Sequence, residues 1–210
     1  MLRRSLTERT GEPAAWLVVG LGNPGDEYVG TLHNLGADVV AVLADRHGGS
    51  LRRSRELALS CEVRIGGQRV ALAFPQTFMN ESGQSVGSLV RRHGIDDPTR
   101  IVVVHDELDL AVGTLRVKAG GGLAGHNGLK SIIGALGSDA FPRIWVGGGG
   151  CESGEKLAGH VLGSFAPGGS KILNEPHLQQ QRPYVTKTMV FSSFLFIEQL
   201  LSHVCGDIAY

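Results

Sequence analysis

The segment WLVVGLGNPGDEY, from Trp16 to Tyr28, decides the fold class, because an apolar strand in it runs directly into a glycine-rich turn. The apolar run Trp16–Val19 predicts a strand that is buried on both faces. The turn Gly20–Gly25 fits the G-x-G-x-x-G pattern of dinucleotide-binding loops. A strand that ends in such a turn is typical of an α/β sheet that binds a ligand at the carboxyl ends of its strands.

The residues after the turn argue against a dinucleotide cofactor. In dinucleotide-binding folds the third glycine opens a helix, whose N-terminal amides bind the pyrophosphate. Here Gly30, Asn34 and Gly36 interrupt any helix after Gly25, and Pro24 removes one amide from the loop. A nucleotide-dependent oxidoreductase is therefore the least favoured function, and no cofactor is expected.

Strand and helix patterns alternate along the chain. Strands are expected at 16–20, 57–75 (a hairpin that turns at Gly66-Gly67), 100–110, 113–122 and 143–150, and helices at 37–49, 79–94 (with Asn80 as its N-cap and Gly94 at its end) and 125–137. This alternation predicts an α/β fold, a single domain with a mixed, twisted central sheet flanked by helices.

Composition divides the chain into three parts. We expect an N-terminal extension at 1–15, an α/β domain at 16–168, and a divergent C-terminal segment at 169–210 that is richer in Gln, Ser and Phe. The extension carries arginines without the apolar stretch of a secretory signal. The end of the C-terminal segment has apolar residues at the spacing of one amphipathic helix: Phe194, Ile197, Leu200, Leu201 and Val204.

Charge and cysteine content narrow the setting in which the protein works. Lys+Arg and Asp+Glu number 20 each, so no overall charge points to nucleic acid, although a local basic patch is still allowed. The three cysteines are widely spaced and form no C-x-x-C pair, which argues against a disulfide framework or a zinc ribbon and fits a reducing compartment. We expect a cytoplasmic protein without a membrane segment. An organellar address is the less favoured alternative, because Glu8 and Glu12 interrupt the Arg-bearing start.

Polar groups stand at the ends of several expected elements, where an α/β sheet usually binds its ligand. His33 can act as a general base near neutral pH, and Asp106, after an apolar strand, can orient it. Asn23, Asn80 and Asn127 each carry a donor and an acceptor, which suits binding of peptide main chain and an oxyanion. The sequence has no G-x-S-x-G nucleophile elbow, so direct attack by water is favoured. Taken singly, these residues also fit loop, strand-end and helix-cap positions.

Three longer motifs follow one another along the chain. GLGNPGDEYVGTLHNLG contains Asn23, Tyr28, His33 and Asn34; FPQTFMNESGQSV contains Met79-Asn80; and VVVHDELDLAVGTLRVKAGGGLAGHNGLKSI contains Asp106, Lys118 and His126-Asn127. In this order, from about Trp16 to Pro167, they resemble the motifs of bacterial-type peptidyl-tRNA hydrolases. Three long motifs in register are far more specific than the glycine turn alone.

The resemblance implies an enzyme that cleaves the ester bond between peptide and tRNA and frees the tRNA for reuse. It implies His33 as the base and Asp106 as its partner, and substrate binding by Asn23, Tyr28, Met79, Asn80, His126 and Asn127. No metal is expected, because His105, Asp106, Asp109 and His126 lack the spacing of a ligand set.

The expected partner is peptidyl-tRNA, bound by its acceptor arm to a monomer. Phosphate contacts are expected from Arg116, Lys118, Lys130 and Arg143. Five further arginines fit two interpretations equally well. They either extend the phosphate-binding surface or form an ordinary solvated surface: Arg52, Arg53, Arg55, Arg91 and Arg92.

Departures from the family pattern keep a second function open. Trp145 replaces an arginine that in the family helps the lysine matched by Lys118 to hold the tRNA 5′ phosphate. Leu32 replaces another arginine, and the usual acidic C-terminal helix is not recognisable. The alternative is a non-catalytic RNA-binding protein of the same fold, similar to a splicing factor. The intact set of His33, Asp106 and asparagines favours the enzyme.

Overall fold

A computed structural model describes residues 12–111, 114–123, 125–148, 197 and 199. Within these residues a seven-stranded sheet has the order β2-β3-β4-β1-β5-β7-β6. The strands are β1 (Trp16–Gly20), β2 (Arg52–Ser54), β3 (Ala58–Ile65), β4 (Gln68–Pro75), β5 (Ile101–Glu107), β6 (Leu115–Ala119) and β7 (Pro142–Gly147). The helices are α1 (Leu35–Arg46), α2 (Ser82–His93) and α3 (Asn127–Leu136), with single 3-10 turns η1 (Asp26–Tyr28), η2 (Leu32–Asn34), η3 (Met79–Glu81) and η4 (Pro98–Arg100).

The sheet is mixed, as the sequence predicts. Strand β1 pairs in parallel with β4 and β5, and β5 pairs in parallel with β7. The pairs β2–β3, β3–β4 and β6–β7 are antiparallel. The parallel strands at the centre are completely buried because helices cover both of their faces.

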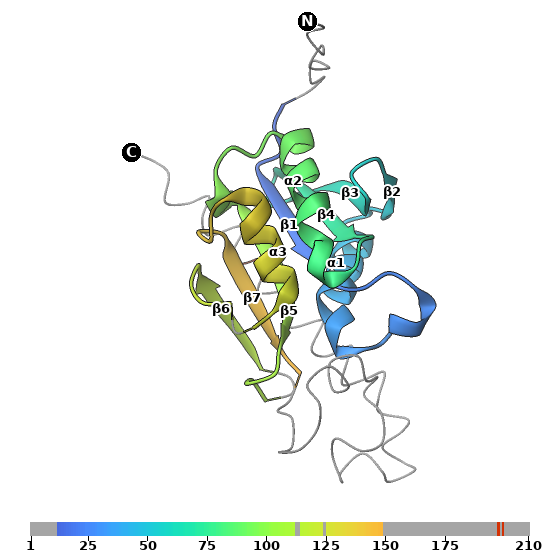
Figure 1. Cartoon of the computed structure of the whole chain (residues 1–210). Coiled ribbons are helices and arrows are strands. Elements are labelled where there is room, and N and C mark those ends of the chain that lie inside the picture. The colour runs from blue at the N-terminus through green and yellow to red at the C-terminus, as the bar shows by residue number, and fades with distance from the viewer. Residues whose placement is uncertain (1–11, 112–113, 124, 149–196, 198, 200–210) are drawn as a thin grey trace, which may run out of the picture.

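Two apolar layers hold the helices on the sheet. Helix α1 packs on one face and helices α2 and α3 lie on the other, side by side (Figure 1). Along β1, Val18 belongs to the first layer, and Leu17 and Val19 belong to the second, as the alternation of a strand requires. Ile197 from the C-terminal part is helical and fully buried in the first layer.

Local signals in the sequence predict most elements and misplace a few. The hairpin turns at Gly66-Gly67, where both residues have positive φ, and Gly94, with φ of 61°, ends α2. Asn80 is not the N-cap of α2, because the turn η3 precedes the helix and its cap position is Glu81. The short edge strand β2 was not predicted. The expected domain boundary at 168 and most of the segment 169–210 lie outside the described residues.

Helix α1 begins in direct backbone contact with the sheet. A Cβ atom added to Gly20 would lie 2.1 Å from the Gly36 carbonyl oxygen, and one added to Gly36 would lie 2.2 Å from the Val104 carbonyl oxygen. The Leu21 amide donates to the Val104 carbonyl oxygen (2.9 Å), and the Ala37 amide donates to the Leu21 carbonyl oxygen (3.1 Å). This contact fixes the residues just before α1 over the carboxyl end of β5.

Replacing Gly36 with Ala should destabilise the protein by about 3 kcal/mol, because the new methyl group would collide with backbone atoms that cannot move away separately. Gly134→Ala is the matched control, since Gly134 lies in α3 and a Cβ there meets nothing within 4 Å. That control should stabilise the fold by about 0.5–1 kcal/mol. Urea unfolding of both variants measures the difference, and equal stabilities would contradict the close contact.

Candidate active site

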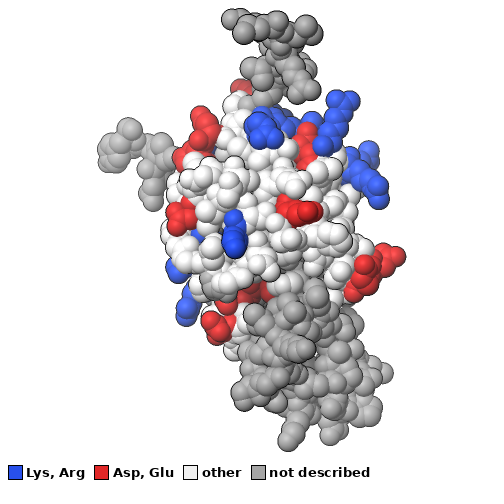
Figure 2. Space-filling view, in the orientation of Figure 1, with Lys and Arg blue, Asp and Glu red and all other residues white. Residues whose placement is uncertain are grey.

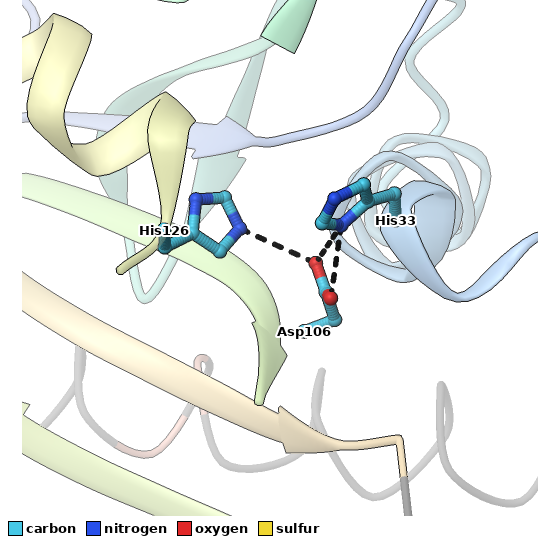
Figure 3. Close-up of side chains that lie close together, drawn as sticks. All are labelled: His33, Asp106 and His126. Carbon is cyan, nitrogen blue, oxygen red and sulfur yellow. Dashed lines mark hydrogen bonds and ion pairs between the residues drawn. The ribbon is translucent and has the colours of Figure 1, made fainter. Parts of the chain in front are cut away.

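His33 and Asp106 form a hydrogen-bonded pair at the carboxyl end of β5 (Figure 3). His33 Nδ1 lies 2.8 and 2.9 Å from the two carboxylate oxygens of Asp106. Since a carboxylate only accepts, Nδ1 carries the hydrogen, so in the neutral imidazole the lone pair is on Nε2. Nε2 has no partner among the described residues. The His33 side chain is 17% exposed while that of Asp106 is 2% exposed, so the free nitrogen belongs to the accessible member of the pair.

A second histidine holds Asp106 from the opposite side. His126 is the N-cap of α3, and its Nδ1 accepts from the amides of Gly128 (3.1 Å) and Leu129 (3.4 Å). Its Nε2 therefore carries the hydrogen and donates to Asp106 Oδ1 over 3.3 Å. The two ring nitrogens of His126 thus have separate roles. Nδ1 stabilises the start of α3, and Nε2 fixes the Asp106 carboxylate.

These contacts keep the Asp106 carboxylate charged. Burial alone would raise the pKa of Asp106, but the hydrogen bonds from His126 and His33 outweigh it and hold that pKa well below its usual range. The site therefore contains a fixed negative charge that favours a positive His33 once that residue has taken up a proton.

A third histidine is buried directly behind this pair. His105 is 1% exposed, its Nδ1 donates to the Asp106 carbonyl oxygen over 2.7 Å, and its ring meets that of His126 edge to face at 4.7 Å. Burial, followed by the nearby His126, lowers the pKa of His105 to about 3. His105 is thus neutral in ordinary conditions and supports the site without carrying charge.

Asn23 is fixed by its neighbours. Asn34 accepts from the Asn23 amide (2.8 Å) and donates to the Asn23 carbonyl oxygen (3.1 Å). The side-chain Oδ1 of Asn23 accepts from the amide of Met79 (2.8 Å), which assigns the other end of the side-chain amide as Nδ2. Asn23 Nδ2 has no partner among the described residues and is the donor that Asn23 can offer to a ligand.

The remaining residues expected to bind substrate lie on elements that meet at this end of the sheet. Tyr28 is in η1, Met79 and Asn80 are in η3, and Asn127 opens α3. Met79 is buried and packs so closely on α3 that a Cβ at Gly128 would lie 2.7 Å from its sulfur. Asn80 and Asn127 are both exposed. No hydrogen bond joins these four described residues to His33 or Asp106.

The expected phosphate contacts divide into exposed and buried groups. Arg116 and Lys118 are exposed on β6, and Lys130 is exposed on α3. Arg143 is fully buried, and its Nη1 donates to the carbonyl oxygens of Gly121 and Gly122 at 2.8 Å each. The expectation that Arg143 contacts phosphate is therefore wrong for this structure, because its guanidinium has no access to solvent and instead holds the glycine loop.

Acidic and basic side chains are interspersed over the visible face of the molecule (Figure 2). The basic ones gather at the end where α2, β2 and β3 lie, which is the part of the chain that carries Arg52, Arg53, Arg55, Arg91 and Arg92. Among these, Arg92 forms an ion pair with Glu56 at 3.4 Å. The arginines at the end of α2 lie away from the His33–Asp106 pair, because α2 ends near the start of the parallel strands, where the Ala14 amide donates to the His93 carbonyl oxygen (3.1 Å).

His33, Asp106 and His126 each offer a ligand-type atom within 4.8 Å of the others, a grouping that a transition metal could use. From the sequence we expected no metal-ligand cluster. This grouping was missed because His33 lies far from Asp106 and His126 along the chain. The same atoms already satisfy one another by hydrogen bonds, and His126 would have to give up its Nε2 hydrogen to bind a metal. The hydrogen-bonded arrangement needs no ion.

Comparison with known proteins agrees with this geometry. Residues 17–193 match the family described as peptidyl-tRNA hydrolase. The chain belongs to this family. It is similar to the peptidyl-tRNA hydrolase of Alkaliphilus metalliredigens (46% identity, covering 76% of this chain and 85% of the relative) and to that of Roseiflexus sp. (45%, covering 83% and 80%).

Solved structures of the same family share the fold. A variant of the peptidyl-tRNA hydrolase from Acinetobacter baumannii is 38% identical, with a TM-score of 0.69 over 88% of this chain and 94% of that one. The peptidyl-tRNA hydrolase of that organism itself is 37% identical with the same TM-score. The family resemblance and fold class inferred from sequence are thereby confirmed.

The dependence of the protein's stability on acidic pH should show that His105 is buried and neutral in the folded state. Because the pKa of His105 is lower in the folded than in the unfolded protein, the unfolded state binds more protons between pH 6.5 and about 3. His105 therefore costs stability as the pH falls below 6.5, by at most about 1.4 kcal/mol per pH unit. His105→Asn keeps a donor without titrating, so its stability should fall less steeply over this window in urea titrations. Parallel curves for parent and variant would contradict the assignment.

Proposed function

We propose that this protein hydrolyses the ester bond between peptide and tRNA in peptidyl-tRNA, with water as the nucleophile and His33 as the general base. The observation that carries the proposal is the orientation of His33, whose Nδ1 is committed to Asp106 while Nε2 is free among the described residues. A binding protein has no use for a histidine held in this way. Membership of the peptidyl-tRNA hydrolase family supplies the substrate class.

The reaction follows from which atoms are free. A water molecule gives a proton to His33 Nε2 as its oxygen attacks the ester carbonyl carbon, and the charge on the imidazolium is balanced by Asp106. The tetrahedral oxyanion then collapses, the bond to the tRNA 3′ oxygen breaks, and the imidazolium returns its proton to that oxygen. The products are a peptide acid and a tRNA with a free 3′ hydroxyl.

Asn23 Nδ2 is the proposed donor to the oxyanion. Its position is fixed by three hydrogen bonds to Asn34 and Met79, so it need not reorganise when negative charge develops. Tyr28, Met79, Asn80, His126 and Asn127 are the proposed surroundings of the peptide and the terminal nucleotide, with His126 acting through Asp106. Amide groups recognise peptide main chain irrespective of side chain, which suits a substrate of arbitrary sequence.

The acceptor arm of the tRNA is proposed to bind through Arg116, Lys118 and Lys130, whose exposure on β6 and α3 leaves them open to phosphates. We further propose that the protein acts as a monomer in the cytoplasm without metal or cofactor. Among the described residues, no helix has the length and hydrophobicity needed to cross a bilayer.

His33→Ala should lower kcat by about 10²–10⁴-fold while tRNA affinity stays near that of the parent, because only proton transfer is lost. Asp106→Asn should lower kcat on the same order, since an amide can stabilise neither the tautomer nor the imidazolium. The measurement is single-turnover hydrolysis of labelled N-acetyl-aminoacyl-tRNA. His47→Ala, at the far end of α1, is the control histidine and should keep the parent rate. Full activity of His33→Ala would falsify the mechanism.

Hydrolysis should persist after exhaustive treatment with EDTA, because the carboxylate and two imidazoles satisfy one another without an ion. Added Zn²⁺ should inhibit, since binding to these three groups removes the base. Loss of activity in EDTA that Zn²⁺ restores would instead assign the cluster to a metal-dependent hydrolase.

Affinity for tRNA should fall steeply with salt, because phosphate contacts release counterions. Lys118→Ala should reduce the slope of log Kd against log salt by about 1, as expected for one lost phosphate contact. Arg100→Ala is the charge-matched control, since Arg100 lies at the opposite end of β5 and pairs with Asp96. Filter binding at several salt concentrations gives the slopes. Equal slopes for Lys118→Ala and the parent would remove Lys118 from the interface.

A further inference from the structure

The loop between β2 and β3 has a leucine where the backbone favours glycine. Ser54 pairs with Ala58, so residues 55–57 form a three-residue hairpin loop. The third residue of such a loop takes the left-handed conformation, and glycine usually fills that position. Here it is Leu57, with φ of 54°, which is the one residue other than glycine with a positive φ in the described part of the chain.

The same leucine exposes an apolar side chain, since Leu57 is 53% exposed. In the left-handed conformation its Cβ is crowded by the following carbonyl oxygen, so leucine is less stable there than glycine or asparagine. A single exposed leucine is ordinary on a protein surface. A leucine that also holds an unfavourable backbone conformation indicates a role for its side chain.

Strand register places the loop at the same sheet edge as Asp106. In β1, Val19 is opposite both Ala73 of β4 and Val103 of β5. Asp106 comes three residues after Val103, and β4 ends two residues after Ala73. The first residue of β3 pairs with that last residue of β4, so the loop just before β3 is level with Asp106.

The surface between this loop and the active site is short and partly apolar. The strand order β3-β4-β1-β5 separates Leu57 from Asp106 by three strand spacings, or about 14 Å. The Gln76 amide, just after β4, donates to the Leu57 carbonyl oxygen over 2.7 Å. Two residues further on, Phe78 is 55% exposed and precedes the buried Met79. Exposed apolar side chains thus stand at both ends of the short segment that joins the loop to the proposed substrate site.

The two parts of the substrate leave the ester in different directions. The tRNA is proposed to bind on β6 through Arg116 and Lys118, and β6 and the β2–β3 hairpin lie on opposite sides of β5 (Figure 1). The side toward β3 is therefore available to the peptide. An extended peptide advances about 3.3 Å per residue, so about four residues reach from the ester to Leu57.

We propose that Leu57 binds an apolar side chain of the peptide, about four residues from the ester. This proposal rests on the proposed function and adds a subsite to its substrate site. The subsite does not restrict which peptides are cleaved, because the amide groups near the ester bind main chain irrespective of sequence. Peptides with an apolar side chain at this position bind more tightly than those with a polar one.

A pair of substrates tests the proposal. Both are tRNAs esterified with the same pentapeptide, except that the fourth residue from the ester is Leu in one and Ser in the other. In filter binding, His33→Ala, which should hold the ester intact, should bind the Leu form about 5-fold more tightly, as expected when the exposed half of Leu57 becomes buried. Moving the Leu to the second residue should abolish the preference, since that residue cannot reach the loop.

Substitution of Leu57 in the His33→Ala background identifies the residue that reads the peptide. Leu57→Asn should lower the ratio of the two dissociation constants from about 5 to about 1. Asparagine adopts the left-handed conformation more readily than leucine, so the variant should resist urea at least as well. Leu57→Met should retain the preference. Val42→Asn, which removes an exposed apolar side chain from α1, is the matched control and should also retain it.

Equal affinities of His33→Ala for the two substrates, or a preference that survives Leu57→Asn, would overturn the subsite. Single-turnover hydrolysis of the same substrates by the parent tests the proposed function separately. A preference that Leu57→Asn removes, without hydrolysis by the parent, would reject the hydrolase and keep the subsite. Hydrolysis without any preference in binding would do the reverse.

Discussion

The backbone contact between the start of α1 and the sheet is the constraint on which the site depends. Gly20 and Gly36 let the helix approach until amides and carbonyls of the two elements bond to each other and to Val104. With side chains at these positions the helix would have to stand away from the sheet. His33 comes three residues before Gly36 and Asp106 two residues after Val104, so the contact sets the distance between base and carboxylate.

The Asp106 carboxylate accepts hydrogen bonds from two histidines, only one of which keeps a ring nitrogen available to act as a base. His33 and His126 both donate to Asp106, but through different ring nitrogens. The second nitrogen of His126 is occupied by amides at the start of α3, whereas that of His33 has no partner among the described residues. Backbone geometry thus decides which imidazole acts as the base. Two donors also compensate the desolvation of a buried charge, which a single exposed partner would do less well.

Much of the fold is readable from the sequence because its signals are local. The apolar run of β5, the Gly66-Gly67 hairpin and the Gly94 helix end all follow from residue types and spacing. Strand β2 escaped prediction because Arg52–Ser54 is short and polar and takes its conformation from pairing with β3. The family and the fold class were predicted correctly, while the roles of individual site residues stay predictions.

The site was harder to predict where side-chain direction matters. His33 and Asp106 were paired correctly, since each ends an element at the same sheet edge. Arg143 was misread because the sequence does not show that its strand lies between β5 and β6 with the glycine loop closed over it. His126 was expected to touch substrate, and its hydrogen bond to Asp106 depends on a helix cap that no local pattern reveals. Asn34, which fixes Asn23, stood in the quoted motif without an assigned role.

The strand order also shapes how the chain reaches this structure during synthesis. Strand β1 is made first, yet it pairs with residues 70–73 of β4 and 101–104 of β5. Until Ile101–Val104 leaves the ribosome, the apolar strand Trp16–Val19 has one unpaired side, and such edges recruit other chains. A chain released before that point would keep an open central strand and would tend to aggregate. The middle third of the polypeptide is therefore the part whose completion commits the nascent chain to fold.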